Sequence, residues 1–409
     1  MTLPFAASSQ STLGIEWELA LVDAATGDLR AEAPDVIAEA LQTAGLGPEE
    51  EHPHVTAEML QNTVELVTGV HRTVGSAAEE LRGIASGILD AAERRGLHLY
   101  CQGSHPFEDP NLQPVTDKDR YNQVVEIAQY WGRQMLIFGV HVHVGLDDVS
   151  KAMPVVNGLV NRFPHFLALS ASSPFWAGGD TGYQSQRTQV FQQLPTAGLP
   201  HQFEDYRDFE RCLEQMVQVG MVNDATECRW DVRAVPRLGT VEMRACDGMA
   251  TIEEIAAVTA LTQCLVHDLS AGLERGQEPP AILPPWYVAE NKWRAARYGM
   301  QAEVIMDAAG TTVPVAEHLS DELDRLAPVA RELECEAELA HVRTMMAEGT
   351  AAERQRRVER EAAAAPPAEG ADAGDTITVE TPVDANTAAL GGTITVATAE
   401  SASISGLGP

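Results

Sequence analysis

Apolar and polar positions alternate in three short stretches that lie far apart in the chain. These are residues 14–23 (GIEWELALVD), 139–146 (GVHVHVGL) and 239–246 (GTVEMRAC). Successive side chains of a strand point to opposite faces, so each stretch predicts a strand with one apolar face and one face of ionisable groups. We expect the three strands to share one sheet, packed on helices at its back and open for chemistry at its front.

Longer stretches with helical spacing separate these strands. We expect helices at 34–44, 73–96, 153–172, 204–220, 251–276 and 315–348, and further strands within 58–68 and at 97–102. The strands are not separated by regular βαβ units of about 30 residues. The pattern therefore predicts an α+β fold, with a largely antiparallel sheet and its helices on one face.

Two loops and the C-terminal segment differ in character from the rest. Residues 104–121 are polar and rich in proline, and residues 174–186 are rich in glycine and aromatic residues, which is typical of functional loops. Residues 361–409 contain no lysine or arginine and too few apolar residues for a core, which favours a disordered tail. The similar motifs DTITVET (375–381) and GTITVAT (392–398) leave a hairpin, or a strand that binds a partner, as an alternative.

The charge of the chain limits the functions that it can have. The net charge of −32 argues against nucleic acid as a partner, since binding to nucleic acid depends on neutralising phosphates. The chain has only three lysines, Lys118, Lys151 and Lys292, and neither a P-loop nor a GxGxxG motif. If a nucleotide binds, arginines and cations held by carboxylates must neutralise its phosphates.

No apolar run of about 20 residues is present, and residues 1–11 do not resemble a secretion signal, so we expect a cytoplasmic protein with no membrane partner. The six cysteines are scattered without a CxxC pair, which indicates reduced thiols. A chain of 409 residues is long enough for one large domain, and a homodimer is possible.

Glu16 and Glu18 form the clearest candidate metal site. Two carboxylates at i and i+2 lie about 6 to 7 Å apart on one strand face, where they can share or flank divalent ions. The neighbouring Trp17 indicates a buried strand, and buried carboxylates need cations, which favours a metal over a merely solvated face. Glu65 lies between apolar residues and would likewise need a cation, whereas Glu58 could equally be an exposed residue.

Two further pairs lie on the other strands. His141 and His143 share one face and are candidate metal ligands, although isolated histidines are more often structural. Glu242 and Arg244 could form a salt-bridge ladder, or a metal ligand beside a guanidinium that stabilises a transferring phosphoryl group. Oxygen ligands accompanied by arginines favour Mg²⁺ or Mn²⁺ over zinc. The basic stretch 291–299 could offset nearby carboxylates or bind an anionic substrate.

Together, six motifs resemble the carboxylate–amine ligase family of bacterial type-2 glutamate–cysteine ligases, in the glutamine synthetase superfamily. They are GIEWELALVD, EMLQNTVELVT, GVHVHVGL, SPFWAGGDTGYQSQR, WDVRAVPRLGTVEMRACD and NKWRAARYG, in collinear order over about residues 11–350. The resemblance implies a curved antiparallel sheet with helices on its convex face. It implies a catalytic domain at 1–350, followed at 351–409 by a helical extension and an acidic tail.

The resemblance also implies roles for individual residues, with ATP and two to three Mg²⁺ (or Mn²⁺) ions on the concave face. Arg244 and Arg233 would be catalytic, and His143 and Lys292 would lie near the nucleotide. Arg187, Tyr183 and Arg297 would bind the amino-acid substrate. The metal ligands would be Glu16, Glu18, Glu58, Glu65, His141 and Glu242.

The implied reaction joins glutamate to the amine of cysteine through an acyl phosphate made from ATP, with the loop 104–121 or 174–187 as a lid. Three alternatives stay open. The same ligase chemistry could use a different amine, or the chain could be a catalytically idle metal- or nucleotide-binding protein that binds a partner through its tail. A metallohydrolase is disfavoured because further histidine and aspartate ligands are missing.

Overall fold

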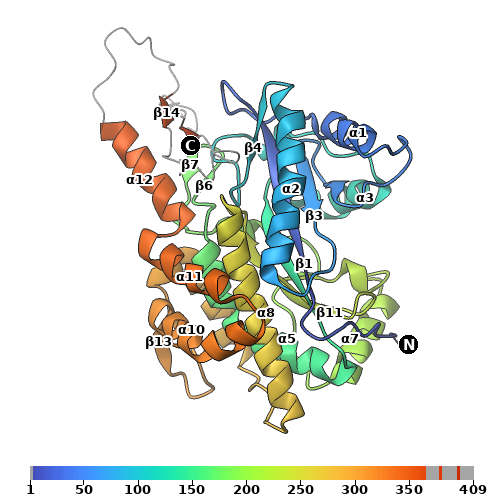
Figure 1. Cartoon of the computed structure of the whole chain (residues 1–409), viewed down its shortest axis with the longest axis vertical. Coiled ribbons are helices and arrows are strands. Elements are labelled where there is room, and N and C mark those ends of the chain that lie inside the picture. The colour runs from blue at the N-terminus through green and yellow to red at the C-terminus, as the bar shows by residue number, and fades with distance from the viewer. Residues whose placement is uncertain (1–2, 365–376, 380–393, 397–409) are drawn as a thin grey trace, which may run out of the picture.

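The computed structural model describes residues 3–364, 377–379 and 394–396 (Figure 1). A seven-stranded sheet with the order β10-β11-β5-β1-β3-β2 forms its centre, and β4 pairs with the far end of β1. Every pairing in this sheet is antiparallel. Its strands are β1 (Leu13–Asp23), β2 (Val55–Ala57), β3 (Thr63–Val67), β4 (Leu97–Tyr100), β5 (Gly139–Gly145), β10 (Val232–Val235) and β11 (Thr240–Asp247).

The strand register places ionisable residues opposite one another on one face. Glu16 is paired with His141, and Glu18 with Glu65. On the other side of β5, Glu242 is opposite His143. The three alternating stretches are therefore neighbouring strands β1, β5 and β11, which confirms the sheet predicted from the sequence.

The back of the sheet is covered by the longest helices, α2, α5 and α8 (Figure 1). Trp17, Leu19, Val142 and Met243 point from the strands into this apolar layer and are at most 1% exposed. Threonines begin two of the helices, since Thr73 and Thr251 each accept a hydrogen bond from a backbone N–H of the first turn. The predicted α+β class, with helices on one face, is confirmed.

The remaining helices surround this core, and pairs of short strands form small sheets of their own. The helices are α1 (Ala33–Thr43), α2 (Val74–Glu93), α3 (Asp119–Ala128), α4 (Tyr130–Arg133), α5 (Ala152–Ser170), α6 (Arg187–Phe191), α7 (Tyr206–Gln218), α8 (Ile252–Glu274), α9 (Pro285–Tyr298), α10 (Val315–Glu332), α11 (Glu336–Glu348) and α12 (Ala351–Ala364). The minor sheets pair β6 (Phe175–Trp176) with β7 (Gly179–Asp180), β8 (Ala197–Gly198) with β9 (Arg229–Trp230), and β12 (Glu303–Ile305) with β13 (Thr312–Pro314).

The predicted helical region 315–348 is confirmed and contains a break. It forms two helices, α10 and α11, because Glu334 takes a left-handed conformation with φ of 56°. The chain turns there so that the N–H of Cys335 bonds to the carbonyl of Ala330. The sulfur of Cys335 then lies 3.6 Å from that of Cys264 on α8, and all six cysteines are free thiols.

The C-terminal segment is described only in part. Helix α12 continues the body, since Arg354 pairs with Glu254 at 2.6 Å and Gln355 donates to the carbonyl of Ser172 at 2.7 Å. Within the acidic tail, β14 (Ile377–Val379) pairs with β15 (Ile394–Val396), in line with the hairpin alternative. The predicted disorder of the other tail residues lies outside the described residues. Among those described, no helix is long and apolar enough to cross a membrane.

Candidate active site

The open face of the sheet gathers carboxylates and imidazoles into three overlapping groups. Within each group, one possible ligand atom from every residue lies within 4.8 Å of the others. The three sets are Glu16 with His143 and Glu242, Glu16 with Glu65 and His141, and Glu18 with Glu58 and Glu65. All six carboxylate and histidine ligands expected from the resemblance therefore come together here, and His143 joins them as a seventh candidate.

Glu16 lies at the centre of this face, between the two histidines of β5. Its Oε2 is 2.9 Å from Nδ1 of His141, and its Oε1 is 3.2 Å from Nε2 of His143. Burial would raise the pKa of Glu16, but the two imidazoles outweigh it and hold that pKa well below its usual range. Glu16 is therefore a carboxylate anion at neutral pH.

The histidines differ in their environments. Burial and the charge of Arg244 lower the pKa of His141 to about 4, so its imidazole is neutral at pH 7 and suited to binding a metal. For His143, burial is outweighed by the nearby Glu242 and Glu16, and its pKa is raised. The Nδ1 of His143 lies 3.0 Å from the hydroxyl of Thr240, which leaves Nε2 toward the two carboxylates.

Glu242 is fully buried between two arginines. Its Oε2 accepts a hydrogen bond from Nε of Arg233 at 2.6 Å, and its Oε1 accepts one from Nη1 of Arg244. Although burial acts to raise the pKa of Glu242, the charges of Arg244 and Arg233 lower it strongly. The salt-bridge ladder considered from the sequence is present, and it also holds Arg244 on the face where the carboxylates gather.

The third ligand group, Glu18 with Glu58 and Glu65, concentrates negative charge. Burial, and then repulsion from Glu58, raise the pKa of Glu18 to about 7. Burial likewise raises the pKa of Glu58 and, together with Glu58, raises that of Glu65 well above its usual range. Three half-buried carboxylates with raised pKa values form a site that a divalent cation would stabilise, because a cation offsets both burial and repulsion.

Arg187, at the start of α6, enters the same face from the glycine-rich loop. Its side chain is buried, with Nη1 donating to the carbonyl of Arg244 at 3.2 Å and Nη2 lying 3.4 Å from Nε2 of His141. Its Nε has no hydrogen-bond partner within the described part of the chain. The guanidinium is therefore near the carboxylates with one donor to spare.

The other residues expected to bind substrate or nucleotide are held elsewhere. Lys292 is buried in an ion pair with Asp231 at 2.6 Å, and Arg297 donates to the carbonyl of Gly182. Tyr183 accepts a hydrogen bond from Trp293 at 3.2 Å. The contacts of Arg297 and Tyr183 join α9 to the glycine-rich loop, whereas Lys292 joins α9 to the residue between β9 and β10. The binding roles of Lys292, Arg297 and Tyr183 remain predictions.

Sequence reasoning assigned no role to two arginines beside this face. The charge of Arg120 on α3 acts on Glu58, and Arg229 on β9 is influenced by Arg120, Arg233 and Arg244. Burial, and repulsion from these arginines, lower the pKa of Arg229. The sequence pattern does not predict helix α3, so it gives no sign of the approach of Arg120, whereas Arg229 directly precedes the WDVRAVPR motif without a distinguishing pattern of its own.

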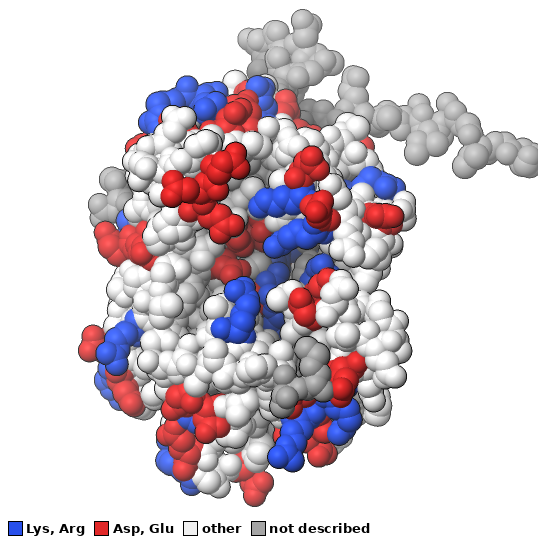
Figure 2. Space-filling view, turned by 90° about the vertical axis from the view of Figure 1, so that its right-hand side faces the viewer, with Lys and Arg blue, Asp and Glu red and all other residues white. Residues whose placement is uncertain are grey.

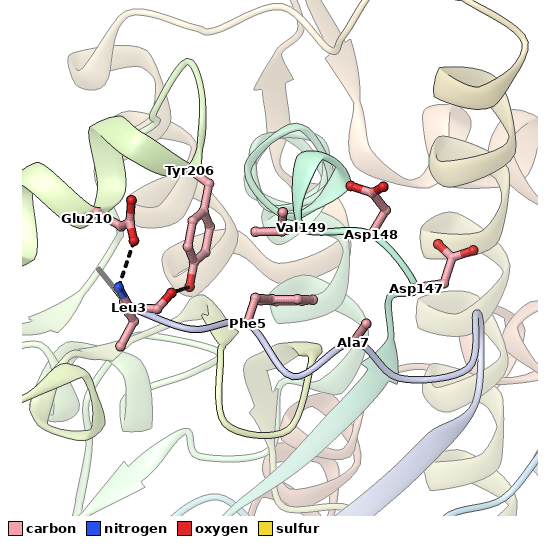
Figure 3. Close-up of a pocket in the computed structure, with 8 residues that line it drawn as sticks. All are labelled: Leu3, Phe5, Ala7, Asp147, Asp148, Val149, Tyr206 and Glu210. Carbon is pink, nitrogen blue, oxygen red and sulfur yellow. Dashed lines mark hydrogen bonds between the residues drawn. The ribbon is translucent and has the colours of Figure 1, made fainter. Parts of the chain in front are cut away.

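The molecular surface has two features of note. Figure 2 shows a hollow near the middle of one face, where basic and acidic side chains lie together. A separate cavity of about 380 Å³ lies between the N-terminal segment and α7, where Glu210 accepts a hydrogen bond from the N–H of Leu3 (Figure 3). None of the residues that line this cavity is an expected site residue. Its lining is Leu3, Phe5, Ala7, Asp147, Asp148, Val149, Tyr206 and Glu210.

Comparison with known proteins identifies the family of this site. The family model of glutamate–cysteine ligase family 2 (GCS2) matches residues 12–377, which include every residue of the carboxylate face. The chain belongs to this family. As a GCS2 member, it is an enzyme, an ATP-dependent carboxylate–amine ligase of the glutamate–cysteine ligase type.

Curated relatives agree with the GCS2 assignment. A protein of Micrococcus luteus named "Putative glutamate–cysteine ligase 2" is 69% identical over 377 residues, which cover 92% of this chain and 94% of the relative. A similarly named protein of Paenarthrobacter aurescens is 53% identical over 359 residues, covering 88% of this chain and 94% of the relative.

Solved structures share the fold of this GCS2 member at low sequence identity. The glutamate–cysteine ligase of Francisella tularensis, solved in complex with AMP, has a TM-score of 0.62 and 13% identity, with 86% of this chain and 85% of that chain covered. A bifunctional glutathione synthetase from Pasteurella multocida has a TM-score of 0.60 and 15% identity, covering 86% of this chain and 50% of that chain.

Proposed function

We propose that this enzyme uses ATP and Mg²⁺ to join the γ-carboxylate of glutamate to the amine of cysteine. The observation that carries the proposal is the set of three overlapping ligand groups on one sheet face, beside Arg244 and Arg233. The relatives named as glutamate–cysteine ligases support the choice of substrates, and the AMP complex of the Francisella tularensis enzyme supports a nucleotide.

The ligand set fits magnesium. Five glutamates supply hard oxygen ligands, which Mg²⁺ prefers, and burial raises the pKa values of Glu18, Glu58 and Glu65, which a bound cation would lower. Glu16, Glu18, Glu58, Glu65, His141 and Glu242 would hold two to three ions, and His143 is positioned to join the group with Glu242. Bound Mg²⁺ would neutralise the phosphates and orient the triphosphate for in-line transfer.

The chemical step needs positive charge where phosphate oxygens gain charge. A carboxylate is a poor acyl donor, and transfer of the γ-phosphoryl group to it gives an acyl phosphate with a good leaving group. Arg244, fixed by Glu242, would stabilise the charge on the transferring group, and Arg233 would assist from β10. Arg120 and Arg229 would extend this positive region toward the other phosphates.

The second half-reaction forms the amide. The amine of cysteine attacks the acyl carbonyl, the C–N bond forms, and phosphate leaves with the electron pair of the broken C–O bond and takes up the proton that the amine nitrogen loses. Arg187, whose guanidinium lies beside His141 on the carboxylate face, would bind the α-carboxylate of glutamate. No enzyme cysteine is required as a nucleophile, in keeping with the raised pKa of buried Cys101 and Cys246.

One assay separates the alternatives. Purified enzyme, ATP, Mg²⁺ and glutamate are incubated with a panel of amines, while ADP is measured and products are identified by mass. We expect ADP release that requires glutamate, with γ-glutamylcysteine as product. A different product mass would identify another acceptor. ADP release without glutamate would contradict the donor, and no turnover with any amine would support a metal- or nucleotide-binding protein that works through its tail.

A further inference from the structure

The last residue of β11, Asp247, is a charged group that the proposed mechanism does not use. Its carboxylate is fully buried, and every hydrogen bond that it accepts from the described residues comes from a neutral donor. Oδ2 accepts from the N–H of Ser172 at 3.0 Å and from the hydroxyl of Ser173 at 2.7 Å, and Oδ1 accepts from the hydroxyl of Ser185 at 2.9 Å.

These serines lie at the two ends of the glycine-rich loop. Ser172 and Ser173 follow α5, and Ser185 precedes α6. Ser173 and Ser185 also form an isolated parallel β-bridge. Asp247 therefore joins the two ends of the loop. Burying its charge destabilises the fold more than a contact between neutral groups would.

Ser173 links this carboxylate directly to Arg187. Its hydroxyl donates to Asp247 and accepts a hydrogen bond from the backbone N–H of Arg187 at 2.9 Å. The charge of Arg187 also acts on Asp247, where it opposes the burial that raises the pKa of this carboxyl. The start of α6, and with it the base of the Arg187 side chain, is thus fixed by a chain of two hydrogen bonds.

Two glycines make room for this arrangement. A Cβ on Gly139 would lie 2.1 Å from Nη2 of Arg187, so the guanidinium occupies the space beside the backbone of β5. A Cβ on Gly103 would lie 2.7 Å from the carboxyl carbon of Asp247. Both the carboxylate and the guanidinium are therefore packed against backbone that lacks a side chain, which leaves little freedom of position for either.

We propose that Asp247 is a positioning residue that acts through Ser173 to hold Arg187 against the carboxylate face, where Arg187 binds the carboxylate of the amino-acid donor. This inference rests on the proposed function for the identity of the donor. It adds a residue, outside the metal ligands, on which affinity for that substrate depends.

The test compares two serine variants that each remove one hydroxyl from Asp247. Ser173→Ala breaks the link to Arg187. Ser185→Ala removes a hydrogen bond to the same carboxylate and a 3.3 Å contact with the hydroxyl of Thr188, and it leaves the N–H of Arg187 bonded to Ser173. We expect Ser173→Ala to raise the KM for glutamate about tenfold, with kcat and the KM for ATP changed by less than about twofold. Ser185→Ala should leave the KM for glutamate near the wild-type value, and Asp247→Asn should raise it further if the variant folds.

An Arg187→Ala background provides the decisive control. If Ser173 acts through Arg187, then Ser173→Ala has no added effect on the KM for glutamate in that background. An equal increase with Ser185→Ala, or an effect that persists without Arg187, would overturn the proposal.

The positioning role can also be read without activity. If the wild-type enzyme shows no glutamate-dependent release of ADP, the proposed function fails, and the crystal structure of Ser173→Ala then decides the positioning role. A guanidinium displaced from Gly139 would support the role of Asp247, and an unmoved guanidinium would overturn it.

Discussion

At the scale of single residues, the site depends on charges that are buried together. Glu16 stays ionised because two imidazoles adjoin it, and Glu242 stays ionised because two arginines do. Glu18, Glu58 and Glu65 have raised pKa values because no comparable cation among the described residues offsets their burial. One sheet face therefore combines carboxylates that adjacent basic groups keep ionised with carboxylates whose pKa values are raised by burial and mutual repulsion.

Replacing Glu16 by glutamine tests the centre of this face. Glu16→Gln keeps the shape but removes a charge that two ligand groups share, so we expect kcat to fall by roughly a hundredfold or more. Isothermal titration with Mn²⁺ should show weakened binding. Glu79→Gln, at an exposed position of α2, is the matched control and should behave like wild type. Unchanged Mn²⁺ binding in Glu16→Gln would contradict the assignment.

Arg244 can be tested with its charge retained. Arg244→Lys keeps a cation near Glu242 but loses the planar fork, so we expect kcat to fall by about a hundredfold while the KM for ATP changes little. Steady-state kinetics provide the measurement. The surface variant Arg343→Lys, which alters a pair with Asp324, should have no effect. A fall in affinity for ATP with full kcat would instead assign Arg244 to ground-state binding.

The sequence predicts those parts of the site that follow from the alternation of side chains along a strand. Side chains at i and i+2 share a face, so alternation alone places Glu16 with Glu18 and His141 with His143. The pairing of Glu18 with Glu65, in contrast, depends on strand register, which alternation does not determine. The approach of Arg187 and Arg120 depends on loop and helix packing between segments far apart in the chain, for which the sequence carries no local signal.

At the scale of elements, the contact between α5 and α10 carries an unusual pair of histidines. His165 on α5 lies with Nε2 at 2.9 Å from Nδ1 of His318 on α10. Burial, and then the charge of His318, lower the pKa of His165 to about 3. Since both rings are neutral at pH 7, protonation of either would place a charge between packed helices.

This pair predicts acid sensitivity. His165 has its ordinary pKa of about 6.5 when unfolded and about 3 when folded, so below pH 6.5 the unfolded chain binds the proton and stability is lost as the pH falls. The loss approaches about 1.4 kcal/mol per pH unit. Urea denaturation at pH 7, 6, 5 and 4.5 gives the free energy of unfolding at each pH. We expect this free energy to fall less steeply with decreasing pH in His165→Gln than in wild type. The exposed His201→Gln is the control, and an unchanged slope in His165→Gln would refute the prediction.

Some helices can be predicted from the sequence and others cannot. Helix α8, predicted at 251–276, begins at Ile252 after its threonine cap, because capping and periodicity are local signals. The division of 315–348 depends on Glu334, a residue type with no preference for a left-handed backbone. Helices α3 and α4 are not predicted from the sequence because they are short and lack a clear apolar stripe. Gln129 between them also has a positive φ, which interrupts the helical pattern.

At the scale of the whole molecule, α12 lies in the helical extension expected after residue 350 and packs against the body. The N–H of Ala352 bonds to the carbonyl of Ala171, and Arg356 pairs with Asp180 in the glycine-rich loop at 2.6 Å. Arg356 also donates to the carbonyl of Tyr183 at 2.8 Å. Helix α12 therefore fastens the loop whose two ends bind Asp247.

Two truncations separate α12 from the acidic tail. Removing residues 365–409 should leave kcat and the melting temperature close to wild type, because every α12 contact described above is retained. Removing residues 351–409 should lower the melting temperature by several degrees and raise the KM for glutamate, since the glycine-rich loop loses Arg356 and Gln355. Equal behaviour of the two truncated proteins, measured by calorimetry and kinetics, would show that α12 is dispensable.

The sharing of Glu16 and Glu65 between neighbouring ligand groups has a consequence for loading with metal. A carboxylate oriented by a first ion is already ordered for the second, and its repulsion toward the adjacent glutamates has already been reduced. Binding at adjoining positions would then be coupled, because the ordering of a shared carboxylate favours the second ion whereas repulsion between the two cations opposes it. A titration with Mg²⁺ would therefore depart from the curve of independent sites, and the direction of the departure would show which of the two effects is larger.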